Sequence, residues 1–296
     1  MKPSVHEFGA QGIYVISDPK NLERRKRFVD SWGIFDDFSY KFVDATMGDD
    51  IDVEALIKEK RLQEFWCGEG AISKNILGCF LSHRSVWEHI IKSQERITES
   101  SYFLIMEDDA IPTSHFTKEA FTNGEFRKIL KFIERNSVDC FWWGRASEKV
   151  SGNYYNKYIK IPDAWQGFGA HAYMVNHNML LELLRCSYQI THPADVLIDI
   201  ICYSGKRYFS PNWSYIRQHS HILHTRFMPF DHPDRVWGST TQPDWFDYDT
   251  RHYEGLYGNV APGFKKYISS AEHKAIHQGP VGISFKFNSV SENSLL

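Results

Sequence analysis

A short apolar stretch that ends in three consecutive acidic residues constrains this chain most. Tyr102–Met106 is a run of apolar, aromatic and β-branched residues without a turn residue, which is the pattern of a fully buried strand. Glu107, Asp108 and Asp109 follow it directly. Adjacent carboxylates at the end of a buried strand repel one another and are costly to desolvate. The stretch therefore predicts either a site for a hard divalent cation, Mg²⁺ or Mn²⁺, or a solvated acidic turn.

The bulk composition limits the class of protein. The chain has 296 residues, enough to bury one large core or two modest ones. Its net charge of −3 argues against a nucleic-acid partner, because nucleic-acid binders carry a basic face. Aromatic residues make up 15% of the chain, a high share that fits dense packing or a surface that faces carbohydrate.

Cysteine usage and hydropathy bear on the compartment. The cysteines are odd in number and scattered, without a Cys-x-x-Cys pair, which is typical of reduced, buried thiols. The apolar runs are too short to span a bilayer, and the first residues lack a signal-peptide pattern. We therefore expect a cytoplasmic protein without a transmembrane segment. The five cysteines are Cys67, Cys79, Cys140, Cys186 and Cys202.

Strand patterns alternate with helical patterns along most of the chain, which favours a single α/β domain with a mostly parallel sheet flanked by helices. We expect this domain over residues 1–224, and an irregular, aromatic and His-rich extension over 225–296 that packs on the core. Strands are predicted at 12–17, 40–43, 102–106, 138–143, 165–175, 207–209 and 214–217, and helices at 18–32, 52–62, 74–92, 126–133, 179–186 and 191–202.

Two groups of residues lie where a ligand of an α/β sheet would bind, next to the carboxyl ends of strands. Arg24, Arg25 and Arg27 come early in the first helix, where a solvated basic face explains at least two of them. His83 falls within the apolar stripe of the longest helix. Such a residue is either a core histidine with its hydrogen bonds satisfied or a ligand-binding group.

Five segments carry a resemblance to a known family. They are GIYVIS followed by ERRKRF, the block GEGAISKNILGCFLSHRSVWEHII, FLIMEDDA, GFGAHAYMVNHNMLLELL and HPADVLID. Together they resemble glycosyltransferase family 25, which includes bacterial lipooligosaccharide galactosyltransferases and collagen galactosyltransferases. The resemblance covers roughly Gly12 to His221, and its middle block is the most specific part.

The resemblance implies a GT-A-type, Rossmann-like fold and an inverting transfer of galactose or glucose from a UDP-sugar, with Mn²⁺ or Mg²⁺ as cofactor. It implies a glycan or glycoconjugate hydroxyl as acceptor. Asp195 matches the Asp of the family's Pro-x-Asp element and is the candidate general base, with Asp199 in reserve. Asp109, together with Glu107 or Asp108, matches the family's acidic metal-binding motif. His219 and His221, from a late segment, are either further metal ligands or surface histidines. The donor candidates are Ser17, Arg24, Arg25, Arg27, Lys74, Ser82, His83 and Asp108.

Two other classes of function stay open at this point. One is a non-catalytic protein that binds nucleotide-sugars or carbohydrates on the same fold, although the intact acidic triplet and Asp195 argue against it. The other is a metal-dependent nucleotidyltransferase. That class usually has a Gly-rich basic loop after the first strand, whereas Ser17-Asp-Pro19 lacks glycine.

Overall fold

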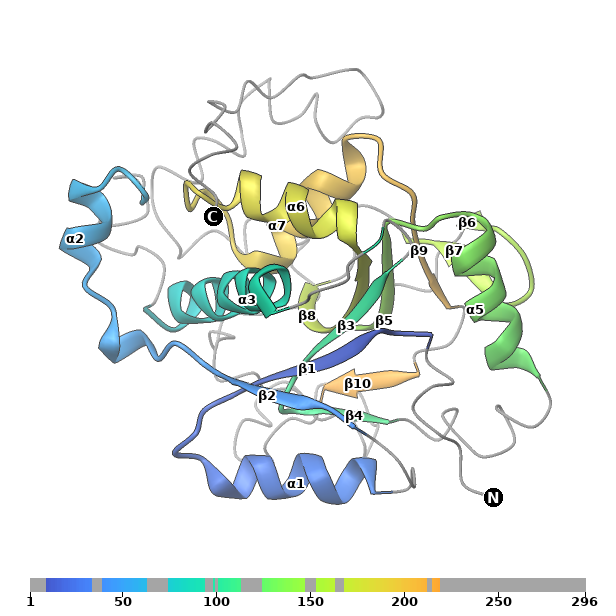
Figure 1. The fold of residues 1–296 in the computed structure, drawn as a ribbon, viewed down its shortest axis with the longest axis horizontal. Coiled ribbons are helices and arrows are strands. Elements are labelled where there is room, and N and C mark those ends of the chain that lie inside the picture. Colours follow the sequence, from blue (N-terminus) through green and yellow to red (C-terminus); the bar gives the residue numbers. More distant parts are fainter. Residues whose placement is uncertain are drawn as a thin grey trace, which may run out of the picture.

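An eight-stranded sheet forms the centre of the molecule (Figure 1). The computed structural model describes residues 9–33, 39–62, 74–93, 98, 101–112, 124–146, 153–162, 168–211 and 215–218. The strand order is β2-β1-β3-β8-β5-β9-β7-β6. Six of the eight strands run in one direction, as expected, but β7 and β8 run opposite to them, so the pairings are a mixture of parallel and antiparallel. The strands are β1 (Gly12–Ser17), β2 (Lys41–Asp44), β3 (Tyr102–Glu107), β5 (Cys140–Ala146), β6 (Asn153–Tyr154), β7 (Ile159–Ile161), β8 (Phe168–Asn176) and β9 (Tyr208–Pro211).

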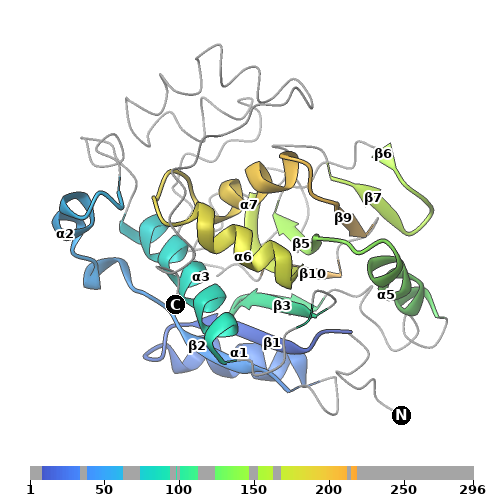
Figure 2. The same cartoon turned by 45° about the horizontal axis from the view of Figure 1, so that its top comes forward.

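Helices cover both faces of this sheet, and the alternation of side chains along the strands explains why. On β3, Phe103 and Ile105 belong to one apolar cluster while Leu104 and Met106 belong to another. The first cluster includes residues of α2, α3, α6 and α7, and the second includes residues of α1 and α5 (Figure 2). The helices are α1 (Leu22–Trp32), α2 (Val53–Lys58), α3 (Lys74–Ser93), α5 (Glu125–Arg135), α6 (His177–Cys186) and α7 (Ala194–Tyr203), with a 3₁₀ turn η2 at Gly48–Asp50.

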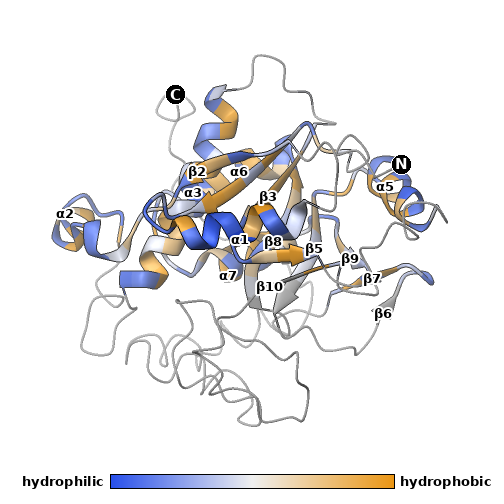
Figure 3. Cartoon of the chain, turned by 90° about the horizontal axis from the view of Figure 1, so that it is seen from below, coloured by the Kyte–Doolittle hydropathy of each residue, from blue (hydrophilic) through white to orange (hydrophobic). Residues whose placement is uncertain are grey.

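The first helix begins later than its sequence suggests. The Asp18-Pro19 pair predicts the start of a helix, but Asn21 is the N-cap and accepts a hydrogen bond from the backbone N–H of Arg24. The side chain of Asp18 instead accepts from the backbone N–H of Lys20, which makes a turn between β1 and α1. Seen from below, α1 presents mostly hydrophilic residues (Figure 3).

A second, small sheet continues directly from the acidic residues. It pairs β4 (Ala110–Pro112) with β10 (Ile216–Gln218) in antiparallel register, with Gln218 opposite Ala110. The sequence predicted a strand near β10 but not β4, since three residues are too few to show a period. This pairing brings residues from late in the chain beside the end of β3.

A close approach of two backbones holds the loop after β2 against α3. A Cβ atom added to Gly78 would lie 2.6 Å from the carbonyl oxygen of Thr46, so the contact requires a glycine. Ser82, one turn further along α3, accepts from the backbone N–H of Thr46 at 2.8 Å. The loop of residues 45–48 is thereby fixed over the first turns of α3.

Some expectations from the sequence fall outside the described residues. They are the boundary at residue 224 and the extension over residues 225–296. Within the described residues, no helix is long and apolar enough to cross a membrane.

Candidate active site

The acidic end of β3 lies in a cleft between α1, α3 and the loop after β2. The cleft is lined by Ile16, Ser17, Asp18, Arg24, Ala45, Thr46, Met47, Gly48, Asn75, Cys79, Ser82, His83, Glu107 and Asp108. The carboxylates do not all point the same way, because Glu107 is the last residue of β3 whereas Asp108 and Asp109 follow the strand. Glu107 faces α3, whereas Asp108 and Asp109 contact Arg24 on α1.

Arg24 bridges the two aspartates. Its Nη2 lies 2.5 Å from Oδ1 of Asp108 and 3.1 Å from Oδ2 of Asp109. Each of the two aspartate side chains is only 5% exposed. Burial works against the charge of Arg24, but Asp109 and Asp108 outweigh it and raise the pKa of the guanidinium. This places Arg24, one of the predicted donor residues, inside the cleft.

Ser17 and Arg25 complete a polar network at the end of β1. Ser17 Oγ donates to Asp108 Oδ2 at 2.8 Å and accepts from Arg25 Nε at 3.0 Å. Arg25 also pairs with Asp44 at 2.8 Å, and its guanidinium lies over the ring of Phe42. These contacts hold Ser17 toward the carboxylates, and they turn Arg25 toward β2.

The pKa values of Glu107 and Asp108 shift in opposite directions. Burial is the largest single effect on Glu107 and opposes its ionisation, but the hydrogen bond with His83 and the charges of His83, His171 and Arg24 together outweigh it, and they lower the pKa of this carboxyl below its ordinary value. For Asp108, burial dominates and raises the pKa, although Arg24 and Ser17 offset part of the effect. One guanidinium contacts two of the three carboxylates, so the group has spare negative charge that a divalent cation would neutralise. Its carboxylate oxygens are the donors that Mn²⁺ and Mg²⁺ prefer.

A buried chain of hydrogen bonds fixes the position of Glu107. Trp87 Nε1 donates to the hydroxyl of Tyr173 at 2.8 Å, and that hydroxyl lies 2.9 Å from Nδ1 of His83. His83 Nε2 lies 3.2 Å from Oε1 of Glu107. The Tyr173 oxygen accepts from Trp87, so the hydroxyl proton of Tyr173 is donated to Nδ1 of His83. The ring proton of His83 is therefore assigned to Nε2, which faces Glu107. His83 thus orients a site carboxylate from a fully buried position.

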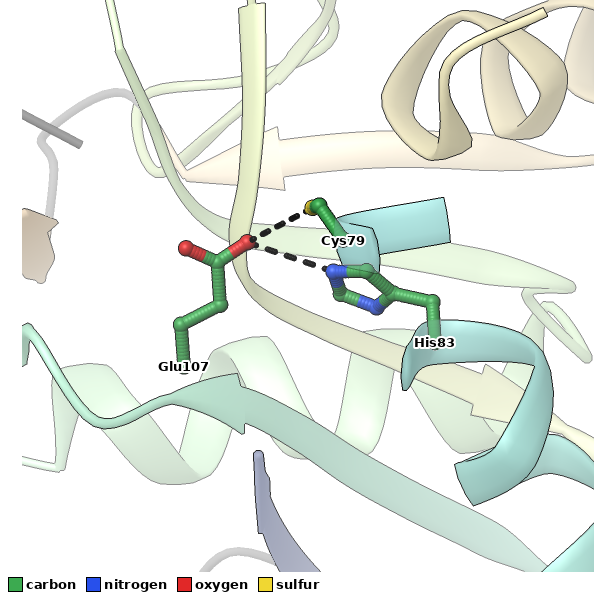
Figure 4. A group of neighbouring side chains, drawn as sticks. All are labelled: Cys79, His83 and Glu107. Carbon is green, nitrogen blue, oxygen red and sulfur yellow. Dashed lines mark hydrogen bonds and ion pairs between the residues drawn. The ribbon is translucent and has the colours of Figure 1, made fainter. Parts of the chain in front are cut away.

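Cys79 lies on the same face of α3 as His83. Its Sγ lies 3.9 Å from Oε1 of Glu107 (Figure 4). Burial raises the pKa of this thiol well above its usual value, and the charge of Glu107 adds to the effect. In this environment, and without a bound cation, the side chain is a neutral thiol.

Asp195 comes to the same edge of the sheet from a different direction. Met106 of β3 pairs with Ala172 of the antiparallel β8, so the beginning of β8 lies beside the end of β3. There the backbone N–H of Gly169 donates to Asp195 Oδ2 at 2.8 Å, while Oδ1 accepts from the N–H of Val196. The pKa of Cys79 is raised most by burial, next by the charge of Glu107, and then by the charge of Asp195. Asp195 therefore lies within electrostatic reach of the cleft.

The other predicted residues lie in varied positions. Asp199, one turn beyond Asp195 on α7, is buried, and Ser82 uses its hydroxyl to bind the loop after β2. Arg27 pairs with Glu23 on α1, with the Glu23 side chain 81% exposed, and Lys74 is exposed at the first residue of α3. The structure thus gathers Ser17, Arg24, Ser82, His83, Glu107 and Asp108 at one cleft, with Asp109 beside it, while His219 and His221 lie outside the described residues.

Sequence reasoning missed three residues of this site. Cys79 had a usable signal, because its spacing of four residues from His83 puts both on one helix face. Tyr173 and His171 lie in an apolar strand pattern that gives no hint of their roles. His171 is buried on β8, and its charge helps to lower the pKa of Glu107, after the effects of burial and His83.

The sequence was compared with known proteins. The sequence model of glycosyltransferase family 25, described as an LPS biosynthesis protein, matches residues 10–198. A comparison with curated proteins finds no match. The matched range contains the acidic end of β3, the Cys79–His83 face of α3 and Asp195.

Proposed function

Because the chain belongs to glycosyltransferase family 25, we propose that it is a metal-dependent, inverting enzyme that moves galactose or glucose from a UDP-sugar. Membership of the family makes the protein a glycosyltransferase that uses a donor and an acceptor substrate. Four points go beyond family membership and are proposed: the metal cofactor, the UDP-sugar donor, the inversion at the sugar and the acceptor. The proposed acceptor is a hydroxyl of a glycan or glycoconjugate. It also adds a GT-A-type topology for the sheet.

The gathering of three carboxylates at the end of β3, with Glu107 and Asp108 in the cleft and Asp109 beside it, is the observation that supports metal dependence. Mn²⁺ or Mg²⁺ would be held by Asp109 together with Glu107 or Asp108, and it would neutralise the diphosphate that leaves the sugar. Gln218 pairs with Ala110, the residue after Asp109, and His219 directly follows Gln218 in the sequence. This pairing supports a further ligand from His219 or His221.

The position of Arg24 supports binding of the donor. Its guanidinium lines the cleft and contacts the carboxylates that would hold the metal, so it can also reach phosphate oxygens there. Arg25 is tied to Asp44 and Ser17, so its proposed role is to hold the end of β1 in position.

The separation of Asp195 from the metal carboxylates supports inversion. In an inverting displacement the base acts on the face of the sugar opposite the leaving diphosphate, so it must come from another element. Asp195 lies at the first turn of α7, and two backbone N–H groups hold its carboxylate in place. We assign it the role of taking the proton from the acceptor hydroxyl, with Asp199 as the alternative.

The test is release of UDP from UDP-galactose and from UDP-glucose, with Mn²⁺ and then with a chelator. We expect release that stops with the chelator and returns with Mn²⁺. Stabilisation by UDP-sugars without any turnover, even with added glycan acceptors, would favour the binding protein. Release of pyrophosphate from UTP and a sugar phosphate would favour the nucleotidyltransferase.

We also propose a reducing, cytoplasm-like compartment. Cys79, Cys140, Cys186 and Cys202 are free thiols, which supports this assignment. Localisation of the tagged full chain after cell fractionation would test it.

A further inference from the structure

Three side chains of different chemistry converge at the inner wall of the cleft. Cys79 and His83 are four residues apart on α3, a spacing that puts them one above the other on the same helix face. Glu107 reaches that face from the end of β3 (Figure 4). One ligand atom from each residue, a sulfur, a nitrogen and an oxygen, lies within 4.8 Å of the other two.

Two of the three spacings between these atoms are close to those around a small tetrahedral ion. Zinc binds thiolate at about 2.3 Å and imidazole or carboxylate at roughly 2.0–2.2 Å, which separates neighbouring ligand atoms by roughly 3.3–3.6 Å. His83 Nε2 lies 3.2 Å from Glu107 Oε1, and Cys79 Sγ lies 3.9 Å from the same oxygen. Adjustments of a few tenths of an ångström would bring both pairs to zinc geometry.

We propose that Cys79, His83 and Glu107 form a site for Zn²⁺ or another thiol-binding divalent cation. Mn²⁺ and Mg²⁺ prefer oxygen ligands, so a thiolate–imidazole–carboxylate set selects a different ion from the one held by aspartates. All three residues line the cleft, so the fourth position of a tetrahedral ion faces the cleft.

The surroundings of His83 suit a metal ligand. When Nε2 binds a metal, the ring proton moves to Nδ1 and needs an acceptor. The hydroxyl oxygen of Tyr173, 2.9 Å from Nδ1, can accept a hydrogen bond from this N–H when its own O–H rotates away. Trp87 donates to the same oxygen and fixes the hydroxyl in place.

The site shares Glu107 with the carboxylates of the proposed Mn²⁺ site, so the two ions compete for it. Zn²⁺ bound here would withdraw Glu107 and fill part of the cleft. The consequence, which rests on the proposed function, is inhibition of sugar transfer by Zn²⁺ at concentrations where Mn²⁺ alone supports activity.

Cobalt(II) is the probe, because it occupies zinc sites and its bond to a thiolate gives a charge-transfer absorption band. We expect one equivalent of Co²⁺ to give this band in the full chain, and Zn²⁺ to abolish it. Cys79→Ser should lose the band. Cys186→Ser is the matched control, since Cys186 lies 3.8 Å from the carboxylate of Glu182 without forming part of this cluster. Asp109→Asn should keep the band, which separates this site from the aspartates.

The outcomes decide between the alternatives. A band that is absent from the wild type, survives in Cys79→Ser or disappears in Asp109→Asn would overturn the proposal. If Cys79→Ser does not fold, alkylation of wild-type Cys79 mapped by mass spectrometry replaces it, and Zn²⁺ should slow that reaction at least tenfold. Spectra and alkylation need no turnover, so they stand even if the transferase assay fails. In the transferase assay, Cys79→Ser should need at least tenfold more Zn²⁺ for half-inhibition.

Discussion

Nη2 of Arg24 lies 2.5 Å from Oδ1 of Asp108, although 84 positions separate the two residues in the sequence. Parallel pairing of β1 and β3 produces this contact, because the two strands end at the same edge of the sheet. Helix α1 begins just after β1, so its first turn faces the residues that follow β3. The predicted basic group and the predicted acidic group are therefore parts of one network.

Replacing Arg24 with alanine should weaken donor binding. Its guanidinium lies in the cleft, and a lost charge-assisted contact with a phosphate costs about 1.5–3 kcal/mol, or roughly tenfold or more in KM. Arg27→Ala is the matched control, because Arg27 pairs with Glu23 instead. Steady-state kinetics should show a raised donor KM in Arg24→Ala only, with the acceptor KM unchanged. An unchanged donor KM in Arg24→Ala would remove this residue from the donor site.

Asp109→Asn should abolish turnover and leave the fold intact. The side chain is buried beside two more carboxylates, and the amide removes a charge that the metal needs. Asp44→Asn is the control, since Asp44 lies at the end of β2, beside β1, but its side chain is 72% exposed. Activity is measured after chelator treatment and return of Mn²⁺. Wild-type activity in Asp109→Asn would remove this residue from the metal site.

Tyr173→Phe should reduce both stability and kcat. Loss of the hydroxyl leaves Trp87 Nε1 and His83 Nδ1 buried without that partner, at a cost of about 1–3 kcal/mol in the free energy of unfolding. Tyr102→Phe is the control, because that hydroxyl bonds Ile133 at the opposite end of the sheet. Urea unfolding should show losses in both variants. Only Tyr173→Phe should also lower kcat, and an unchanged kcat would mean that the hydrogen-bond chain serves packing alone.

Asp195→Asn should lower kcat by ~100-fold or more while donor binding is preserved. The amide oxygen can still accept from the N–H of Gly169, so the variant removes proton acceptance rather than the anchoring bond. The measurement is kcat at saturating donor and acceptor, with donor affinity from a thermal-shift titration. A wild-type kcat in this variant would pass the role to Asp199.

The metal-free protein should respond to acid differently in two further variants. The pKa of Glu107 is lower in the folded protein than its ordinary value of 4.5, so ionised Glu107 stabilises the fold above pH 4.5. This contribution disappears as the pH falls through the lowered pKa of the folded protein. The raised pKa of Asp108 has the opposite sign: it destabilises the fold above that raised value and has no effect below pH 3.8. On acidification, the free energy of unfolding should therefore fall less in Glu107→Gln and more in Asp108→Asn than in the wild type. Urea titrations with a chelator at pH 7 and pH 3 measure this, and the reverse order would contradict the assigned shifts.

The sequence was enough to predict the α-helices, most strands of the large sheet and the acidic end of β3, but not β4, β6 or β7. Local patterns were enough for this, because an apolar run such as Tyr102–Met106 and the helical stripe of residues 74–92 show their periods within one element. The same patterns placed the acidic triplet at a strand end and His83 on an apolar helix face. The family resemblance added Asp195, whose role no local pattern reveals.

Which of these residues contact one another depends on how the elements pack in three dimensions. Three arginines lie within residues 24–27 of α1, yet they have different partners. Arg24 contacts the aspartates, Arg25 pairs with Asp44 and Arg27 pairs with Glu23. The antiparallel insertion of β8 beside β3 brings Tyr173 to His83, and it brings Gly169 to the edge where it binds Asp195. These contacts depend on the strand order and on the direction of β8. Both are set by packing between segments far apart in the chain, so no periodicity within one segment can encode them.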